Sequence, residues 1–337
     1  MVNKYKMAFA AIALLIIPGC TDLTEFDHSM MAGISVFHTP DLTCVHTIEN
    51  ISGARSLCAL PDCFIAATTE GTVFRFDLQT YEQTGIFNIG SPSSSGYHEI
   101  EYSFYENSVY IIGALGQILE VSVPDMEVLD AFNVCETPVD IEVSPDPELS
   151  FFYVAGATSR RIFELKLASN AVSRSCILPS SPTCMAIPES MDTIMVGTLA
   201  ETEIVSLVTA SMKRRRMDHF PGILAIETVP NDTTFCAVFS SYSLNSISTI
   251  LKFFPNPFSP DPLYTGVVNI EGDIHYMAAA ESDGTRIYVL SYMGNNGSRL
   301  ISYNCVEYFI ESQIDLPGYP LDLEISPGGT LLVLTAE

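Results

Sequence analysis

Four glutamates recur at the same place in a repeated segment of this chain: Glu101, Glu142, Glu227 and Glu324. If the repeats bring these side chains together, mutual repulsion raises the pKa of some of the carboxyl groups, and such a carboxylate cluster is of the kind that can hold Ca²⁺. The acidic residues do not follow the spacing of a calcium-binding loop. We therefore expect the four glutamates to line a water-filled channel, and we expect neither a metal ion nor a cofactor.

Three longer polar loops carry the other candidate residues for recognition. Aromatic and amide side chains on loops suit binding by stacking and hydrogen bonding. The alternative is neutral insertion into surface loops, which is thermodynamically tolerated. The candidate binding residues are Tyr97, His98, Tyr242, Asn245, Tyr292, Met293, Asn295 and Asn296.

The usual catalytic signatures are missing from the sequence. There is no G-x-S-x-G, no H-E-x-x-H and no glycine-rich phosphate loop, and no two histidines have metal-ligand spacing. Eight cysteines follow Cys20. An even number permits disulfides in an exported chain, whereas most of these cysteines lie in apolar stretches where a reduced thiol serves as a small core residue.

Composition restricts the classes of partner. The 337 residues are 47% hydrophobic and carry a formal net charge of −25, which indicates a folded acidic protein. Such a chain is repelled by phosphate backbones, so we expect no nucleic-acid partner. The only basic run, residues 213–216, is predicted to form a solvated hairpin turn; an acidic polymer or subunit bound there is the alternative.

A repeated unit must position these residues, and it is clearest at residues 137–170. Short apolar stretches at 141–144, 151–155 and 161–167 predict three strands separated by Pro-, Gly- and Ser-rich turns, and 171–178 predicts a fourth. Turns between the first and second strands fall near residues 61, 104, 145, 189, 230, 282 and 327, which are 41 to 52 residues apart. Four strands in about forty residues are typical of a β-propeller blade.

The two ends of the repeated region complement each other. Residues 33–50 predict two strands that correspond to the third and fourth of a blade, and residues 319–337 predict only the first two. We therefore expect an all-β fold, a seven-bladed propeller of four-stranded antiparallel blades. Pairing of the N-terminal with the C-terminal strands would close the ring and remove an open sheet edge.

The motif P-x-x-h-x-h-S-P-D/G, followed by an apolar strand, is present at Pro138 to Asp146 and at Pro320 to Gly328. A third good match is Ser282-Asp283-Gly284 followed by Ile287-Tyr288-Val289. This pattern resembles the seven-bladed YVTN-type propeller family. The resemblance implies the fold but no activity, since propellers of this kind include lactonases, quinoprotein dehydrogenases and binding proteins. The absence of Trp argues against a quinoprotein.

The N-terminus predicts an address outside the cytoplasm. Lys4 and Lys6 precede an apolar stretch too short to span a bilayer, as in a secretory signal. Residues 15–20 resemble a bacterial lipobox, which implies lipidation of Cys20; an ordinary signal with a chance cysteine is the alternative. The predicted organisation is a signal peptide at 1–19, a tether at 20–32 and a propeller at 33–337, lipid-anchored to a membrane of the cell envelope.

Two functions are compatible with this reading. The first is a non-enzymatic binding module for a protein or surface ligand. The second is a lactonase-like hydrolase with its site at the mouth of the central channel, where only Arg55, His98 and Glu99 approach a catalytic set. Because no catalytic constellation is recognisable, the binding module is preferred.

Overall fold

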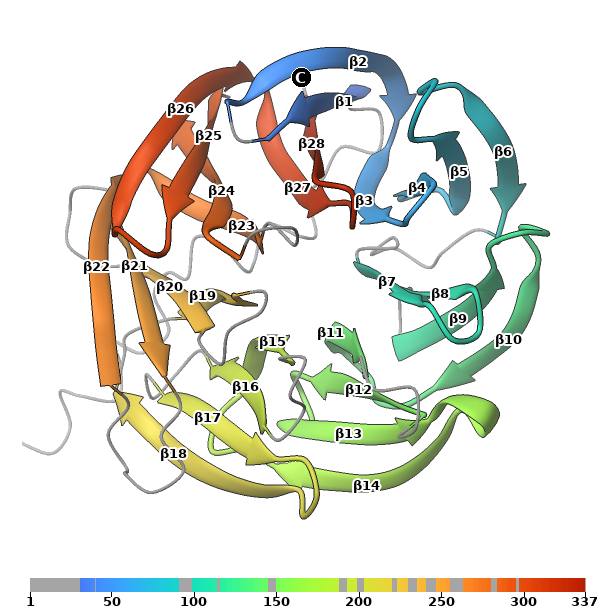
Figure 1. Ribbon diagram of the computed structural model, residues 1–337. Helices are drawn as coiled ribbons and strands as arrows, with labels where there is room; N and C mark the ends of the chain where they lie inside the picture. The colour runs from blue at the N-terminus through green and yellow to red at the C-terminus, as the bar shows by residue number, and fades with distance from the viewer. Residues whose placement is uncertain are drawn as a thin grey trace, which may run out of the picture.

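The chain folds into seven small sheets arranged around a ring, as Figure 1 shows. The computed structural model describes residues 31–39, 41–90, 99–113, 116–144, 150–187, 193–198, 203–219, 223–229, 235–240, 247–254, 263–279, 284–294 and 297–336. In this part of the chain, 28 strands form seven four-stranded antiparallel sheets. The expected all-β propeller architecture is confirmed, and each sheet is called a blade below.

Each of the first six blades is built from consecutive strands. Blade 1 contains β3 (Ala54–Ala59), β4 (Cys63–Thr68), β5 (Thr72–Asp77) and β6 (Gln83–Asn88). Blade 2 contains β7 (Glu99–Ser103), β8 (Ser108–Ile112), β9 (Gln117–Ser122) and β10 (Val128–Asn133). Blade 3 contains β11 (Pro138–Val143), β12 (Phe151–Gly156), β13 (Arg161–Lys166) and β14 (Ala171–Ile177), with a one-turn 3-10 helix, η3 (Leu167–Ser169), before β14.

Blade 4 contains β15 (Pro182–Ala186), β16 (Thr193–Thr198), β17 (Glu203–Val208) and β18 (Lys213–His219). Blade 5 contains β19 (Ile223–Thr228), β20 (Phe235–Ser240), β21 (Ile247–Phe254) and β22 (Leu263–Glu271). Blade 6 contains β23 (Asp273–Ala279), β24 (Arg286–Gly294), β25 (Gly297–Asn304) and β26 (Phe309–Pro317).

Blade 7 combines the two ends of the described chain. Its strand order is β27 (Tyr319–Ile325), β28 (Thr330–Ala336), β1 (Met31–His38) and β2 (Thr43–Ser52). β1 pairs with β28 over seven residue pairs, from Ala32 opposite Ala336 to His38 opposite Thr330. The inner strands contact one another in the order β3, β7, β11, β15, β19, β23 and β27, and β27 contacts β3 again.

The second strands pack between neighbouring blades on both faces, as their continuous apolar sequences predict. Phe64, Ile65, Ala66 and Ala67 of β4 are all fully buried, and so are Leu331 to Leu334 of β28. Ile65 and Ala67 pack with Val109 and Ile111 of blade 2, whereas Phe64 and Ala66 pack with Leu332 and Leu334 of blade 7. Since successive side chains of a strand point to opposite faces, one strand contributes to two inter-blade cores.

A repeated turn joins the third strand to the outer strand of five blades. Its last residue lies in the left-handed region, with φ between 50° and 62°, and its amide donates to the carbonyl of the residue four positions earlier. These residues are Tyr81, Met126, Asn170, Met212 and Tyr308. In every blade, the pairing of the outer strand with the third strand contains a register shift, or β-bulge. Such bulges twist a sheet edge and help to discourage edge-to-edge association.

Some sequence-based expectations differ from the structure. β1 begins at Met31, so the last two residues of the expected tether belong to a strand. The basic run 213–216 lies within the outer strand β18, because the turn before it is formed by residues 209–212. The signal peptide, Cys20 and the turns expected near residues 145, 189, 230 and 282 lie outside the described residues. No helix in the described chain is long and apolar enough to cross a membrane.

Candidate functional site

The inner strands place acidic side chains in two tiers around the axis of the ring. In β11 and β27 a register shift is followed directly by an aspartate, Asp140 or Asp322, and two residues later by a glutamate, Glu142 or Glu324. Glu99 and Glu101 occupy the matching positions in β7. In β19, Glu227 occupies the same position as Glu142 and Glu324. The first tier thus contains Glu99, Asp140 and Asp322, and the second contains Glu101, Glu142, Glu227 and Glu324.

The strand periodicity explains where these side chains point. Ile141 and Val143 pack with blade 2 residues such as Tyr110 and Ile112, so Asp140 and Glu142 face the opposite way, toward blade 4. Each acidic residue in the two tiers is partly exposed. These acidic side chains therefore lie between neighbouring blades, at the edge that faces the axis of the ring. They are largely surrounded by protein but keep part of their surface exposed.

The carboxylates are hydrogen-bonded to the neighbouring blade. Asp322 Oδ2 accepts a hydrogen bond of 2.6 Å from the backbone amide of Leu57 in blade 1, and Asp140 Oδ2 accepts one from the amide of Met185 in blade 4. In the second tier, the backbone amides of Ala59 and Val143 act to lower the pKa values of Glu324 and Glu101, against the larger effect of burial. These amides belong to inner strands, which have no further strand on the axial side. The acidic side chains therefore satisfy donors that the sheets leave unpaired.

Burial and mutual repulsion shift the acid–base behaviour of the two tiers. Desolvation raises the pKa of Glu101 to about 8, those of Asp140 and Glu227 to about 7, and that of Asp322 to about 6. Desolvation, followed by repulsion from other tier carboxylates, also raises the pKa values of Glu99, Glu142 and Glu324 well above the usual range. Part of the ring therefore holds protons near neutral pH.

Blades 1, 4 and 6 carry no acidic residue at the tier positions, and blade 5 carries one only in the second tier. Ser56 and Cys58 occupy the two tier positions in β3, and Cys184 occupies the first position in β15. Burial, then repulsion from Glu324, raises the pKa of the Cys58 thiol; burial raises that of Cys184 to about 12. Seven of the eight cysteines that follow Cys20 are free thiols, so none of the disulfides that the even count permits is found among them; these are Cys44, Cys58, Cys63, Cys135, Cys176, Cys184 and Cys305. Within the described residues, no three His, Cys, Asp or Glu side chains are placed to hold a metal ion.

Only two of the eight loop candidates lie in the described part of the chain. The ring of Tyr292 packs against Tyr319 of blade 7, with centroids 4.9 Å apart, and the sulfur of Met293 lies near Gly272 and the Ser291 hydroxyl. Both residues are partly exposed at the end of β24. The other six, Tyr97, His98, Tyr242, Asn245, Asn295 and Asn296, lie outside the described residues, so the structure brings none of them together.

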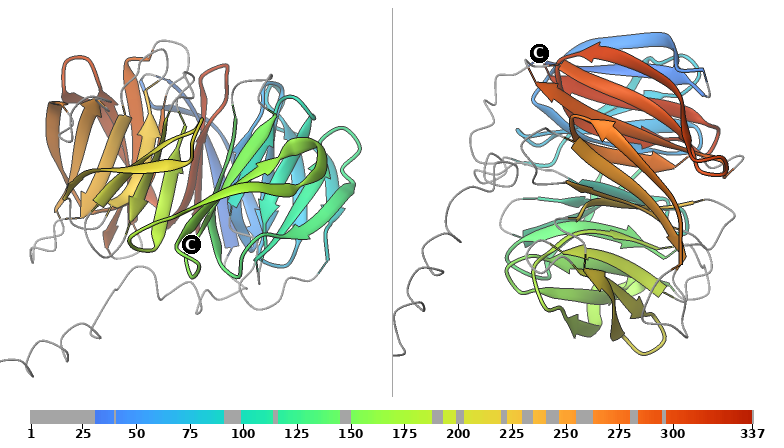
Figure 2. Two further views of the ribbon diagram at one scale, coloured as in Figure 1. Left: turned by 90° about the horizontal axis from the view of Figure 1, so that it is seen from below. Right: turned by 90° about the vertical axis from the view of Figure 1, so that its left-hand side faces the viewer.

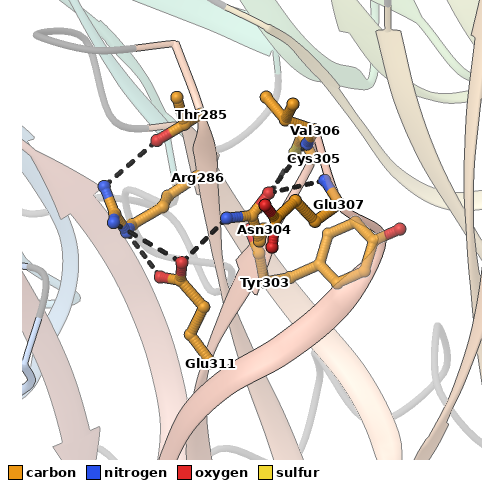
Figure 3. A network of polar contacts seen from close by, with 8 residues as sticks. All are labelled: Thr285, Arg286, Tyr303, Asn304, Cys305, Val306, Glu307 and Glu311. Carbon is orange, nitrogen blue, oxygen red and sulfur yellow. Dashed lines mark hydrogen bonds and ion pairs between the residues drawn. The ribbon is translucent and has the colours of Figure 1, made fainter.

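A separate polar network ties the strands of blade 6, as Figure 3 shows. Arg286 Nε donates to Glu311 Oε2 at 2.5 Å, and Asn304 Nδ2 donates to Glu311 Oε1 at 2.8 Å. The Asn304 Oδ1 atom accepts from the amides of Val306 and Glu307 at 2.9 and 2.8 Å. Because these groups are engaged with one another across three strands and a turn, we assign the network to blade structure.

The second-tier glutamates were predicted from the sequence, whereas the first-tier aspartates were not. The available signal was the five-residue repeat Pro138-Val-Asp-Ile-Glu142, which recurs as Pro320-Leu-Asp-Leu-Glu324. It predicts two acidic side chains on the same face of the strand. The hydrogen bonds from amides of the next blade to these carboxylates could not be deduced from the sequence, because they depend on how the blades pack.

Comparison with known proteins identifies the fold class. The chain matches no protein-family model and no curated protein. Among solved structures it is similar to U3-55K, with a TM-score of 0.67 and 10% identity over 89% of this chain and 98% of that one. It is also similar to the RRP9 WD40 repeats, with a TM-score of 0.67 and 10% identity over 90% and 98% of the two chains.

A third similar structure is Kuenenia stuttgartiensis hydrazine synthase, with a TM-score of 0.68 and 13% identity over 85% of this chain and 95% of that one. At these identities the similarity concerns the fold alone. The chain is a β-propeller.

Proposed function

We propose that this chain is a non-enzymatic binding propeller, lipid-anchored on the extracytoplasmic side of a cell-envelope membrane. In this proposal the ring has seven blades of the YVTN type and is closed by the pairing of β1 with β28. The anchor is a lipid on Cys20, and the partner is a protein or surface ligand. No cofactor is required, and the net charge of −25 disfavours nucleic acid.

The observation that carries the proposal is that tier carboxylates form hydrogen bonds between neighbouring blades. Asp140 and Asp322 accept hydrogen bonds from amides of the next blade, so they act as inter-blade joints. A catalytic acid or base must have its proton-transferring atom within reach of substrate. The fold class supports the same conclusion, since WD40-like propellers are generally interaction modules.

The geometry favours one face of the ring as the binding face. Met31 lies opposite Ser52 and Ala32 opposite Ala336, so the start of β1 and the end of β28 lie on the face where outer strands connect to the next blade. Tyr292 and Met293, at the end of β24, lie on the same face. A tether formed by residues 20–30 spans at most about 40 Å. A lipid at Cys20 would therefore keep this face toward the membrane, within reach of a partner at its surface.

Site-specific photo-crosslinking in whole cells tests this function. A benzophenone amino acid in place of Tyr292 reports on the proposed binding face, and the same group in place of Phe104 reports on the opposite face, where Phe104 is 68% exposed in the β7–β8 turn. We expect a discrete crosslinked partner from position 292 and none from position 104. Adducts from position 104 alone, or from neither position, would contradict the proposal.

One observation keeps a lactonase-like hydrolase as the second candidate. Arg55 lies near enough to Asp322 to lower the pKa of its carboxyl, against the larger effect of burial, and Glu99 repels the same group. Carboxyl groups with raised pKa values beside an arginine are also found at catalytic sites. Hydrolysis of any member of a lactone panel, abolished by Glu99→Gln or His98→Ala, would favour the enzyme over the binding module.

A further inference from the structure

Positive charge is concentrated in one sector of this acidic chain. Residues 150–219 contain eight of the 15 Lys and Arg residues but only six of the 40 Asp and Glu residues. The sector therefore has a net charge of +2, and the rest of the chain has −27. It forms the strands β12 to β14 of blade 3 and all of blade 4. The composition of the whole chain does not show this uneven distribution of charge.

The basic side chains gather where the outer strands of these two blades meet. Figures 1 and 2 show β14 and β18 following one another along the outer rim. Arg214 Nη1 of β18 donates to the carbonyl of Ile177 in β14 at 3.2 Å, and Arg174 Nη2 of β14 donates to the carbonyl of Thr209 at 3.0 Å. We call the surface formed by Arg160, Arg161, Arg174, Lys213 and Arg214 the rim patch.

Among the described residues, most of the charge in the rim patch has no carboxylate partner. Arg174 forms an ion pair with Glu164. In contrast, Arg160 donates to the carbonyl of Pro179 at 3.4 Å, and Arg161 donates to the Ser175 hydroxyl at 2.9 Å. Among the described residues, Arg160, Arg161, Lys213 and Arg214 have no acidic partner. Since a guanidinium has five N–H donors, the bonds to neutral oxygens orient these groups and leave donors for an anion.

Exposed apolar side chains lie in the same place. Val172 and Ile177 of β14 are 50% and 55% exposed, and the carbonyl of Ile177 is the acceptor for Arg214. β14 is also the outermost strand of its sheet, so in the described structure one of its edges has no strand partner. The rim patch therefore offers three kinds of contact to one ligand: guanidinium donors, apolar surface and strand-edge amides and carbonyls.

We propose that the rim patch binds an extended acidic polypeptide segment that also carries apolar side chains. Acidic side chains match the unneutralised guanidiniums, apolar side chains cover Val172 and Ile177, and an extended backbone can pair with the edge of β14. A long polyphosphate fits less well because it has no apolar groups, and a long nucleic acid fits less well because its phosphates would run from the patch onto the strongly acidic rest of the molecule. At physiological ionic strength the Debye length is about 8 Å, so a short segment experiences the local positive charge.

Binding of a fluorescent peptide to the full chain tests the proposal. The probe alternates Asp and Val over about ten residues, the length needed to follow two short strands. We expect Arg161→Gln with Arg214→Gln to weaken its binding by about tenfold or more, because charge-assisted hydrogen bonds are lost. Arg75→Gln is the matched control: Arg75 also donates to carbonyls of the next blade, Val123 and Pro124, but lies in blade 1.

Two further measurements make the test decisive. Lys213→Glu changes an exposed side chain that has no polar partner among the described residues, so it should weaken binding without affecting the fold. Ile177→Ser should weaken binding of the Asp-Val probe but not of an Asp-Ser probe. Unchanged affinity in the Lys213 and double-Arg variants would overturn the proposal, as would equal affinity for polyphosphate of the same charge. The crosslinking at position 292 reports on a different face, so the two proposals can fail independently.

Discussion

Asp322 on β27 accepts a 2.6 Å hydrogen bond from the backbone amide of Leu57 on β3, although 265 positions separate the two residues in the sequence. Leu57 is 1% exposed, so its amide has no access to bulk water. The same joint exists between Asp140 and Met185 at the interface of blades 3 and 4. A short local motif thus supports a long-range contact, between blades 7 and 1.

Asp322→Ala should destabilise the protein by about 1–3 kcal/mol, because it leaves a buried amide without an acceptor. Asp322→Asn retains an acceptor oxygen and should be less harmful. Urea denaturation followed by circular dichroism measures the free energy of unfolding. Asp41→Ala, at an exposed turn position, provides the control. Equal stability of the Asp322→Ala and Asp41→Ala variants would contradict the role assigned to the joint.

Because the pKa values of the tier carboxyl groups are raised, we expect the protein to lose stability as pH rises. Their folded pKa values, about 6 to 8 where a value is given, lie above the values near 4 of unfolded Asp and Glu. The native state therefore binds more protons in this range, and the stabilisation present below pH 4 is lost as pH rises through 6 to 8. Thermal unfolding should show a lower Tm at pH 8.5 than at pH 5.5. Glu101→Gln should reduce this difference, whereas Glu49→Gln, on the exposed outer strand β2, should not.

The repeat period was sufficient to predict the propeller, because a strand buried between two blades requires a continuous apolar sequence. Leu331 to Leu334 and Phe64 to Ala67 show that pattern clearly and are fully buried. The boundaries of the strands were harder to predict. Met31 and Ala32 were assigned to the tether, but Ala32 pairs with both Ile51 and Ala336. Pairing partners so distant in sequence leave no local signal.

The candidate site was only partly predictable for a related reason. The equivalence of Glu101, Glu142, Glu227 and Glu324 follows from aligning the repeats, but the hydrogen bonds of Asp140 and Asp322 depend on the adjacent blade. The rim patch is a second example. The run 213–216 was visible as charge, but Arg161 and Arg174 join it only because blades 3 and 4 are neighbours.

Left-handed turn residues offer a test in which backbone strain competes with burial. Tyr308 has φ of 62° and is 36% exposed, so Tyr308→Gly should be neutral or stabilising by up to about 1 kcal/mol, since glycine adopts this conformation freely. Met126 has φ of 55° but is 7% exposed and packs in the core between blades 1 and 2. Met126→Gly should destabilise, because burial of such a side chain contributes about 1.5–3 kcal/mol. Chemical denaturation of both variants distinguishes the two effects; a similar change in both would contradict this balance.

The proposed anchor makes a localisation prediction. Cys20→Ser should move the protein from the membrane fraction to the soluble exported fraction, because a single sulfur would carry the lipid. Fractionation followed by immunoblotting measures the distribution, and Cys44→Ser is a matched control at an exposed cysteine of the propeller. Full membrane retention of the Cys20→Ser protein would show that the lipoprotein proposal is wrong.

The pairing of β1 with β28 predicts a sharp difference between two N-terminal deletions. Removal of residues 21–50 eliminates β1 and most of β2, including Ile34, Val36 and Phe37, which are fully buried. It also exposes the edge of β28, whose residues Leu331 to Leu334 are apolar and uncharged, so the truncated protein should aggregate. Removal of residues 21–30 leaves every described strand intact and should have little effect on folding. Solubility and thermal unfolding of the two proteins, measured side by side, decide the matter: if the longer deletion folds as well as the shorter one, β1 and β2 do not complete the seventh blade.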